Sequence, residues 1–337
     1  MTIPHTPAAL FDWESIKRGE AANVMLTFEC GDRAGEIPLR IVKGKEQGPT
    51  LLILAAVHGD EYDGVRTVIE LIHSLQPQDI RGTLLMVPIV NMPAYEGISR
   101  VTPLDGKNLA REFPGSPEGS YTERLAYYLD QYILAKADFL LDLHSGAMEF
   151  SIPVLVGYYA NEEQEIGRRS RAAAEAFGME TIWAHPQVGP GRTVSAATER
   201  GIPWLYTEAS GGRRIKLAEQ EQYRRGAYRL MHHLGMLLAP EAWLLQPAPA
   251  IKRRLKGDGN FDASLLASVD GFFIPAVELL QIVEEGEYVG SLYGLFGEEL
   301  EKLHAPSSGI VVGLAEMPYI KKAGIVCSIT GVGGITL

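Results

Sequence analysis

Three apolar runs in this chain end in side chains that bind metals or move protons. The runs read "LLILAAVHGDEYDG" (51–64), "LLDLHSG" (140–146) and "LYTEASGG" (205–212). Each has the composition of a buried strand, and they end in His58 and Glu61, in His144, and in Glu208. In open α/β sheets, ligands bind beyond the carboxyl ends of the strands. If the three strands are parallel, all four side chains lie at one edge of one sheet.

The residue types favour a catalytic zinc site. Two histidines and one glutamate form a catalytic zinc set, with a water molecule in the fourth position. His58 and Glu61 are three positions apart across a strand-to-helix turn, close enough to share an ion, and His144 comes from another strand. Structural zinc sites use cysteines, but Cys30 and Cys327 lie far from these residues in the sequence. We predict one Zn²⁺ per chain, with another divalent metal as the alternative.

Glu208 is the candidate for a carboxylate that transfers protons. Zinc lowers the pKa of its bound water to roughly 7, and a carboxylate that is not a ligand must then move the proton. Glu208 stands at the end of its own predicted strand, before the flexible segment "ASGG". Asp142 precedes His144 by two positions on the same side of a strand, from where it could orient that ligand.

Each motif also has an ordinary structural interpretation. A histidine and a glutamate at this spacing are usually a coincidence, "DLH" fits a hydrogen-bonded core histidine, and Glu208 could cap the next element. The metal interpretation rests on all the motifs occurring together at strand ends. The other histidines lack that setting: His232 and His233 fit a helix surface, and His185, before Pro186, is undecided.

Three arginines and an asparagine lie in loops rich in glycine and proline. The long segment 91–120 contains Arg100, Asn108 and Arg111, and "GPGRT" contains Arg192. Arginine binds carboxylates in a bidentate manner and stays charged, which suits an anionic substrate and a developing oxyanion. For each arginine alone, a solvated surface charge is the alternative. Together they predict the substrate-binding side of the site.

Strands that alternate with helices must position these residues. We expect strands over 50–57, 83–91, 137–144, 152–159 and 201–208, and helices after the first strand, over 161–177 and around 223–234. "SYTE" is a capping-box pattern in which Ser120 and Glu123 begin another helix. Short alternating runs in the first fifty residues predict a β lead-in. The alternation predicts an α/β fold, with a largely parallel sheet flanked by helices.

A small second domain is expected at the C-terminus. We predict a catalytic domain over 1–245, a linker over 246–256 and an all-β domain over 257–337, because this last part has short β runs and no helical period. Residues 281–314 resemble the hairpin pattern of biotinyl/lipoyl-like domains, which implies a barrel-sandwich-like fold. Those domains carry a lysine at a hairpin tip, whereas "LFGEEL" stands here, so we expect a structural cap and no carrier role.

Composition restricts the partners. The formal net charge of −11 argues against nucleic acid or an anionic membrane surface. No apolar run reaches the ~20 residues that span a bilayer, and the N-terminus lacks the features of a secretory signal. Two distant cysteines suit a reducing compartment. We therefore expect a cytoplasmic protein with a small anionic substrate; a homo-oligomer is compatible with the sequence.

Four motifs in register resemble one family. "HGDE", "DGKNLAREFPG", "DLHSG" and "ERGIPWLYTEASGG" are similar to the succinylglutamate desuccinylase/aspartoacylase family, which is zinc-carboxypeptidase-like, across nearly the whole chain. The two-domain layout resembles the deacylase subgroup that includes N-acetyl-diaminobutyrate deacetylase. The resemblance implies a zinc-dependent hydrolase of N-acyl amino acids. It implies the following roles: His58, Glu61 and His144 as ligands, Glu208 as general base and acid, Arg100 polarising the scissile carbonyl, and Asn108, Arg111 and Arg192 at the substrate.

One departure from the family bears on the substrate. The usual "NLNR" is "NLAR" here, so Ala110 replaces an asparagine that helps to bind the substrate. An alanine side chain cannot hydrogen-bond, so the substrate's anionic end is either different or held by arginine alone. A carboxypeptidase acting on short peptides, and a metal- or ligand-binding protein without turnover, are the two alternatives.

Overall fold

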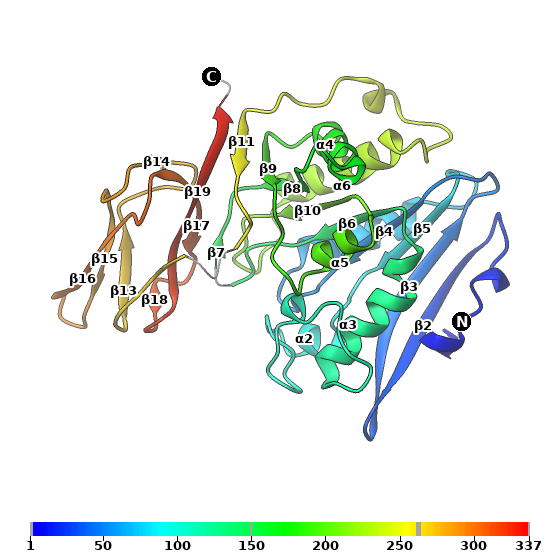
Figure 1. Cartoon of the computed structure of the whole chain (residues 1–337), viewed down its shortest axis with the longest axis horizontal. Helices are drawn as coiled ribbons and strands as arrows, with labels where there is room; N and C mark the ends of the chain where they lie inside the picture. Colours follow the sequence, from blue (N-terminus) through cyan, green and yellow to red (C-terminus); the bar gives the residue numbers. More distant parts are fainter. Residues whose placement is uncertain (1–2, 149, 261–263, 336–337) are drawn as a thin grey trace.

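A computed structural model describes residues 3–148, 150–260 and 264–335 of the chain. At its centre β5 (Thr83–Val87), β4 (Thr50–Ala55), β6 (Phe139–Leu143) and β10 (Trp204–Glu208) lie side by side in one sheet (Figure 1). β4 is parallel to both β5 and β6, and β10 is parallel to β6. The prediction that the three reactive motifs follow parallel strands is confirmed.

The sheet is mixed because it continues on both sides with other orientations. β2 (Ala21–Cys30) and β3 (Arg33–Lys43) form an antiparallel hairpin that joins β5 through β3, which is the predicted β lead-in. On the other side β8 (Leu155–Tyr159) is antiparallel to β10, and β9 (Thr181–His185) is parallel to β8. The sequence patterns did not predict β9.

Helices cover both faces of this sheet, as the α/β prediction requires. α1 (Asp63–Ser74), α4 (Glu165–Phe177) and α6 (Leu217–His233) pack on one face. α3 (Tyr121–Tyr132) and α5 (Thr193–Glu199) pack on the other face, opposite α4 and α6 (Figure 1). α3 begins as predicted, because the Glu123 carboxylate accepts the backbone N–H of Ser120 at 2.8 Å.

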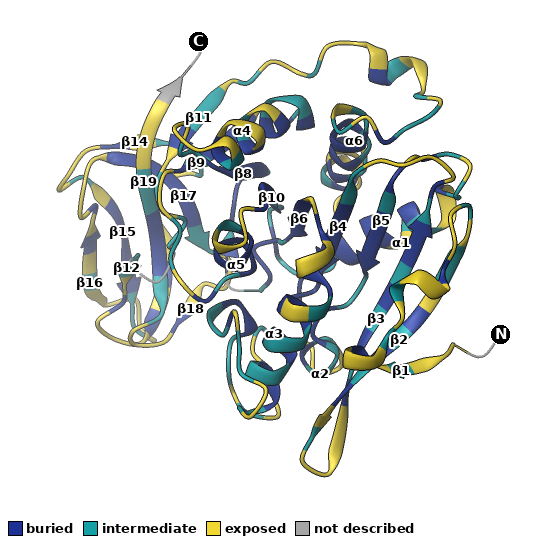
Figure 2. Cartoon of the chain, turned by 45° about the vertical axis from the view of Figure 1, so that its right-hand side comes forward, coloured by how far each residue is buried: buried dark blue, intermediate teal, exposed yellow. Residues whose placement is uncertain are grey.

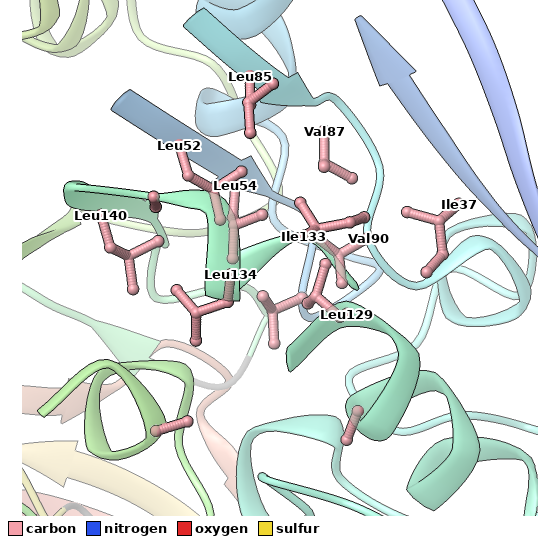
Figure 3. Close-up of a cluster of buried hydrophobic side chains, with 14 of the residues drawn as sticks. Ile37, Leu52, Leu54, Leu85, Val87, Val90, Leu129, Ile133, Leu134 and Leu140 are labelled. Carbon is pink, nitrogen blue, oxygen red and sulfur yellow. The ribbon is translucent and has the colours of Figure 1, made fainter. Parts of the chain in front are cut away.

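The central strands are apolar on both sides because both sides are buried. Leu52 and Leu54 of β4 belong to the core under α3, whereas Leu51 and Ile53 belong to the core under α1 and α6. Figure 3 shows the first of these cores, where leucines of β4 and β5 face α3 residues such as Leu129. This packing fixes where the carboxyl ends of the strands emerge.

The C-terminal part is all-β, as predicted. β16 (Glu299–His304), β15 (Tyr288–Tyr293), β13 (Gly271–Pro275) and β18 (Tyr319–Ile320) form a small antiparallel sheet, at the left of Figure 1. The tip between β15 and β16 carries Leu295 and Phe296, both 96% exposed.

The segment predicted as a linker contributes a strand. β11 (Arg253–Lys256) pairs in parallel with β9 and antiparallel with β19 (Ile325–Ile335), so the central sheet extends into the C-terminal part. The division of the chain into domains remains a prediction.

The remaining elements are short. Among the described residues they are β1 (His5–Pro7), α2 (Met92–Glu96), β7 (Phe150–Ser151), β12 (Leu265–Leu266), β14 (Ile282–Val283), β17 (Gly309–Ala315) and the 3₁₀ turns η1 (Ala8–Leu10), η2 (Trp13–Ser15), η3 (Leu109–Arg111), η4 (Leu134–Lys136) and η5 (Ala242–Leu245). Within the described ranges, no helix has the length and apolar character needed to cross a membrane. Figure 2 shows the strands of the central sheet buried beneath a more exposed outer layer.

Candidate active site

The structure brings His58, Glu61 and His144 together at the carboxyl edge of the sheet. His58 and Glu61 lie in the loop between β4 and α1, and His144 directly follows β6. Glu61 Oε1 is 2.7 Å from His58 Nδ1, and Glu61 Oε2 is 2.9 Å from His144 Nδ1. One ligand atom from each residue lies within 4.8 Å of the others.

The loop that carries the first two residues needs glycine at its turn. A Cβ added at Gly59 would lie 1.9 Å from the backbone carbonyl carbon of Ala94, so only glycine fits there. His58 and Glu61, in the same loop, are only 4% and 2% exposed. Their positions are therefore set by packing.

The second nitrogen of each histidine is held by an oxygen acceptor. His58 Nε2 lies 3.0 Å from Asn108 Oδ1, and His144 Nε2 lies 3.0 Å from Asp142 Oδ2. Metal-bound histidines almost always donate their other N–H in this way, which fixes the tautomer and the ring orientation. Both rings thus present Nδ1 to a shared centre with Glu61, an arrangement that fits a divalent metal such as zinc.

Electrostatics within the cluster favour a charged glutamate. Burial alone would raise the pKa of Glu61, but the neighbouring His58 and His144 outweigh it and hold this pKa far below its usual range. Burial, followed by the positive charge of Arg100, lowers the pKa of His58. Burial opposes protonation of His144 too, but the Asp142 and Glu61 carboxylates raise its pKa well above normal. A buried anion flanked by two imidazoles is suited to a cation.

Asp142→Asn is expected to weaken zinc binding by about 10- to 100-fold, because the amide orients His144 less firmly and makes it a weaker donor to the metal. Asp142 also accepts a hydrogen bond from Thr193, so its own position is fixed. Competition with a chromogenic chelator measures the affinity, with the exposed Asp32→Asn as the control. Equal zinc affinity in Asp142→Asn and wild type would contradict the assignment.

Glu208 lies beside the cluster without belonging to it. It ends β10 and lines one cavity together with His58 and His144. Its Oε2 is buried and has no hydrogen-bonding partner among the described residues. Burial, partly offset by His144 and reinforced by Glu61, raises the pKa of Glu208 to about 8. A carboxyl group with this pKa can take up and release a proton near neutral pH.

The raised pKa makes the stability of the metal-free protein depend on pH. The folded state keeps a proton on Glu208 that the unfolded state loses near pH 4.5. The free energy of unfolding therefore falls as pH rises from about 4.5 to about 8. Glu208→Gln has no such titration. Its free energy of unfolding relative to wild type is expected to rise by a few kcal/mol between pH 5 and pH 9. Denaturant unfolding of both proteins at the two pH values measures this gain, with the exposed Glu199→Gln as control. A difference that does not change with pH would contradict it.

The three predicted arginines all line the same cavity as Glu208. Arg100 Nη1 is 3.4 Å from Glu61 Oε1, Arg111 Nη1 donates to the carbonyl of Ala110 at 2.9 Å, and Arg192 Nη2 is 3.4 Å from Asn260 Oδ1. Asn108 is not among the described residues that line the cavity, and it lies against His58 instead.

Sequence reasoning missed several residues of the cavity wall. The wall includes His185, Tyr206 and Asp258. Tyr206 could have been found, because it precedes Glu208 by two positions on one strand and so shares its side. His185 ends β9, a strand that was not predicted, and Asp258 lies in the part assigned to another domain.

The fold and the site define a class of α/β proteins in which reactive side chains gather at the carboxyl edge of a mixed sheet. The model of the succinylglutamate desuccinylase/aspartoacylase catalytic domain matches residues 47–234. The chain belongs to this family.

Three relatives illustrate the match. N-alpha-acetyl-L-2,4-diaminobutyric acid deacetylase of Halomonas elongata is 33% identical over 228 residues, which are 67% of this chain and 66%, just under two thirds, of the relative. The product-bound ectoine utilization protein EutE (DoeB) of Ruegeria pomeroyi is similar with a TM-score of 0.83 and 26% identity, over 94% of this chain and 97% of that one. A family member from Rhodobacter sphaeroides is similar with a TM-score of 0.82 and 27% identity, over 96% of this chain and 98% of that one.

Proposed function

We propose that this protein is a zinc-dependent hydrolase that removes the acyl group from a small N-acyl amino acid. The convergence of His58 Nδ1, His144 Nδ1 and the Glu61 carboxylate beside the cavity that holds Glu208 is the observation that supports it. We also propose that the protein acts in the cytoplasm.

In this proposal His58, Glu61 and His144 hold one zinc ion. When bound, zinc polarises a carbonyl and makes hydroxide available near neutral pH. Glu208 receives the proton of the attacking water and passes it to the leaving amine, as its pKa near 8 allows.

The other predicted residues bind the substrate or orient a metal ligand. Arg100, which lines the cavity with its Nη1 3.4 Å from Glu61 Oε1, stabilises the negative charge that the carbonyl oxygen gains. Arg111 and Arg192 hold the carboxylate of the substrate. Asn108, expected at the substrate, orients His58 through its Nε2.

The Halomonas relative suggests the first substrate to test, an amino acid acetylated on its α-nitrogen. Release of free amine from acetylated 2,4-diaminobutyrate and other acetylated amino acids tests the proposal, alongside a panel of dipeptides. Hydrolysis of the acetylated amino acids with little hydrolysis of dipeptides supports a deacylase. The reverse result would favour the carboxypeptidase. Thermal stabilisation by these compounds without amine release would favour the binding protein.

A further inference from the structure

Part of the active-site cavity is lined by apolar side chains. Five of the lining residues belong to the hydrophobic core under α3 or pack against that core: Ala110, Val188, Val194, Trp204 and Tyr206. The same cavity contains Glu208 and the two histidines of the metal cluster. The hydrophobic core therefore reaches the place where the amide bond of a substrate is cut in the proposed function.

The strand β10 leads from the reacting groups into this apolar part. Trp204, Tyr206 and Glu208 alternate along the strand, so their side chains lie on the same face of it. Tyr206 and Glu208 are partly exposed, whereas Trp204 is fully buried. A substrate with its scissile carbonyl beside Glu208 therefore has an aromatic surface next to it, in the direction of the core.

The polar atoms of this aromatic surface are bonded within the protein. Trp204 Nε1 donates to Thr198 Oγ1 at 2.8 Å, and the Tyr206 oxygen lies 2.9 Å from His185 Nε2. His185 Nδ1 donates to the Gly257 carbonyl at 2.9 Å, and burial lowers the pKa of His185 to about 4, so the ring is neutral and its Nε2 accepts the tyrosine proton. The ring centroids of His185 and Tyr206 lie 5.4 Å apart, and those of Trp204 and Tyr206 6.2 Å apart. The three rings thus form one uncharged surface.

Ala110 sets how much room these residues leave. It is the middle residue of η3, and its backbone is held on both sides: its N–H donates to Asn108 Oδ1 at 2.9 Å, and its carbonyl accepts from Arg111 Nη1 at 2.9 Å. Ala110 is 8% exposed, and its side chain is a single methyl group. Because its backbone is fixed, a larger side chain at this position would occupy the cavity.

The arginines proposed to hold the substrate carboxylate lie next to this apolar lining in the sequence. Arg111 directly follows Ala110, and Arg192 precedes Val194 by two positions. Both arginines line the same cavity. A substrate whose carboxylate they hold can therefore place an uncharged group against the apolar residues.

We infer that Ala110, Val188, Val194, Trp204 and Tyr206 form a pocket for an apolar group of the substrate, and that Ala110 determines how large this group is. The substrate class is an N-acyl amino acid that carries a hydrocarbon group of several carbons, on the acyl side or on the amino-acid side of the amide. Burying this group removes apolar surface from water, whereas a charged group here would lose its hydration. The inference rests on the proposed function and deepens it.

Five substrates test the pocket. N-acetylglycine is the reference, N-acetylnorvaline adds three carbons on the amino-acid side, and N-pentanoylglycine adds three carbons on the acyl side. Nα-acetyl-2,4-diaminobutyrate and N-succinylglycine are their charged counterparts. The zinc-loaded full chain is expected to hydrolyse one of the two extended apolar compounds with kcat/KM about 10- to 100-fold above that for N-acetylglycine, and its charged counterpart without this gain. The compound that shows the gain assigns the pocket to its side of the amide.

Two substitutions test the residues of the pocket through the ratio of kcat/KM for the preferred compound to that for N-acetylglycine. Ala110→Leu fills the pocket and is expected to lower this ratio at least about tenfold. Ala135→Leu is the matched control, because Ala135 is the exposed middle residue of η4. Val188→Thr keeps the volume, adds a hydroxyl group and is expected to lower the ratio about 3- to 10-fold. The exposed Val269→Thr is its control.

The outcomes separate the pocket from the proposed function. A ratio that falls in Ala110→Leu and Val188→Thr and not in the controls supports the pocket, and Val188→Thr decides alone where Ala110→Leu does not fold. The pocket is overturned, and the deacylase stands, where wild type gains nothing from either extended compound, prefers the charged counterparts, or keeps its ratio in both variants. No amine release from any of the five would overturn the proposed function, and the pocket with it.

Discussion

Glu208→Gln is expected to keep zinc and to lose amide hydrolysis by about 10²- to 10⁴-fold in kcat, because a glutamine amide cannot accept and return a proton. The substitution preserves the size of the side chain and does not touch the ligands. Glu208 is also the group whose pKa, raised to about 8 by burial, suits the transfer. Steady-state amine release at pH 7 to 8, with zinc content measured on the same samples, checks both parts of this result.

Glu199→Gln provides the matched control, since Glu199 is exposed at the end of α5 and should tolerate the change. A Glu208→Gln protein that turns over within a few fold of wild type would remove Glu208 from proton transfer. Loss of zinc together with activity would instead make Glu208 part of the metal site.

His58→Ala is expected to abolish stoichiometric zinc binding. The substitution removes one of three ligand atoms and leaves the buried Glu61 carboxylate without its closest partner, at 2.7 Å. Mass spectrometry should find about one zinc per wild-type chain and almost none in the variant. Zinc should also raise the unfolding temperature of wild type and leave that of the variant unchanged.

His233→Ala is the control, because His233 is exposed at the end of α6 and its loss should leave the zinc content unchanged. Unchanged zinc content in His58→Ala would show that the ion binds elsewhere. Absence of metal from reconstituted wild type would favour the alternative of a protein without zinc chemistry.

The sequence predicts best those parts of the site that follow from the residue pattern of a single strand. β4, β6 and β10 are short, mostly apolar segments, and this composition predicts that their ends, with His58, His144 and Glu208, lie at one edge of the sheet. Asp142 could be placed beside His144 from the two-residue period of a strand, and its carboxylate lies 3.0 Å from His144 Nε2.

The cavity wall depended on contacts between distant segments, which local patterns do not encode. Asp258 reaches the cavity because β11, inside the predicted linker, pairs with β9. Asn108 turns toward His58 because its Oδ1 also accepts the backbone N–H of Ala110, which fixes the side chain in the first turn of η3. Neither contact follows from a spacing of residue types.

Titration of metal-free protein with zinc, with amine release from an N-acetyl amino acid as the readout, tests the central claim most directly. We predict that hydrolysis rises from near zero in proportion to added zinc and stops rising at one zinc per chain, in wild type and not in His58→Ala. Full activity in demonstrably metal-free protein would contradict the claim that His58, Glu61 and His144 form a catalytic zinc site.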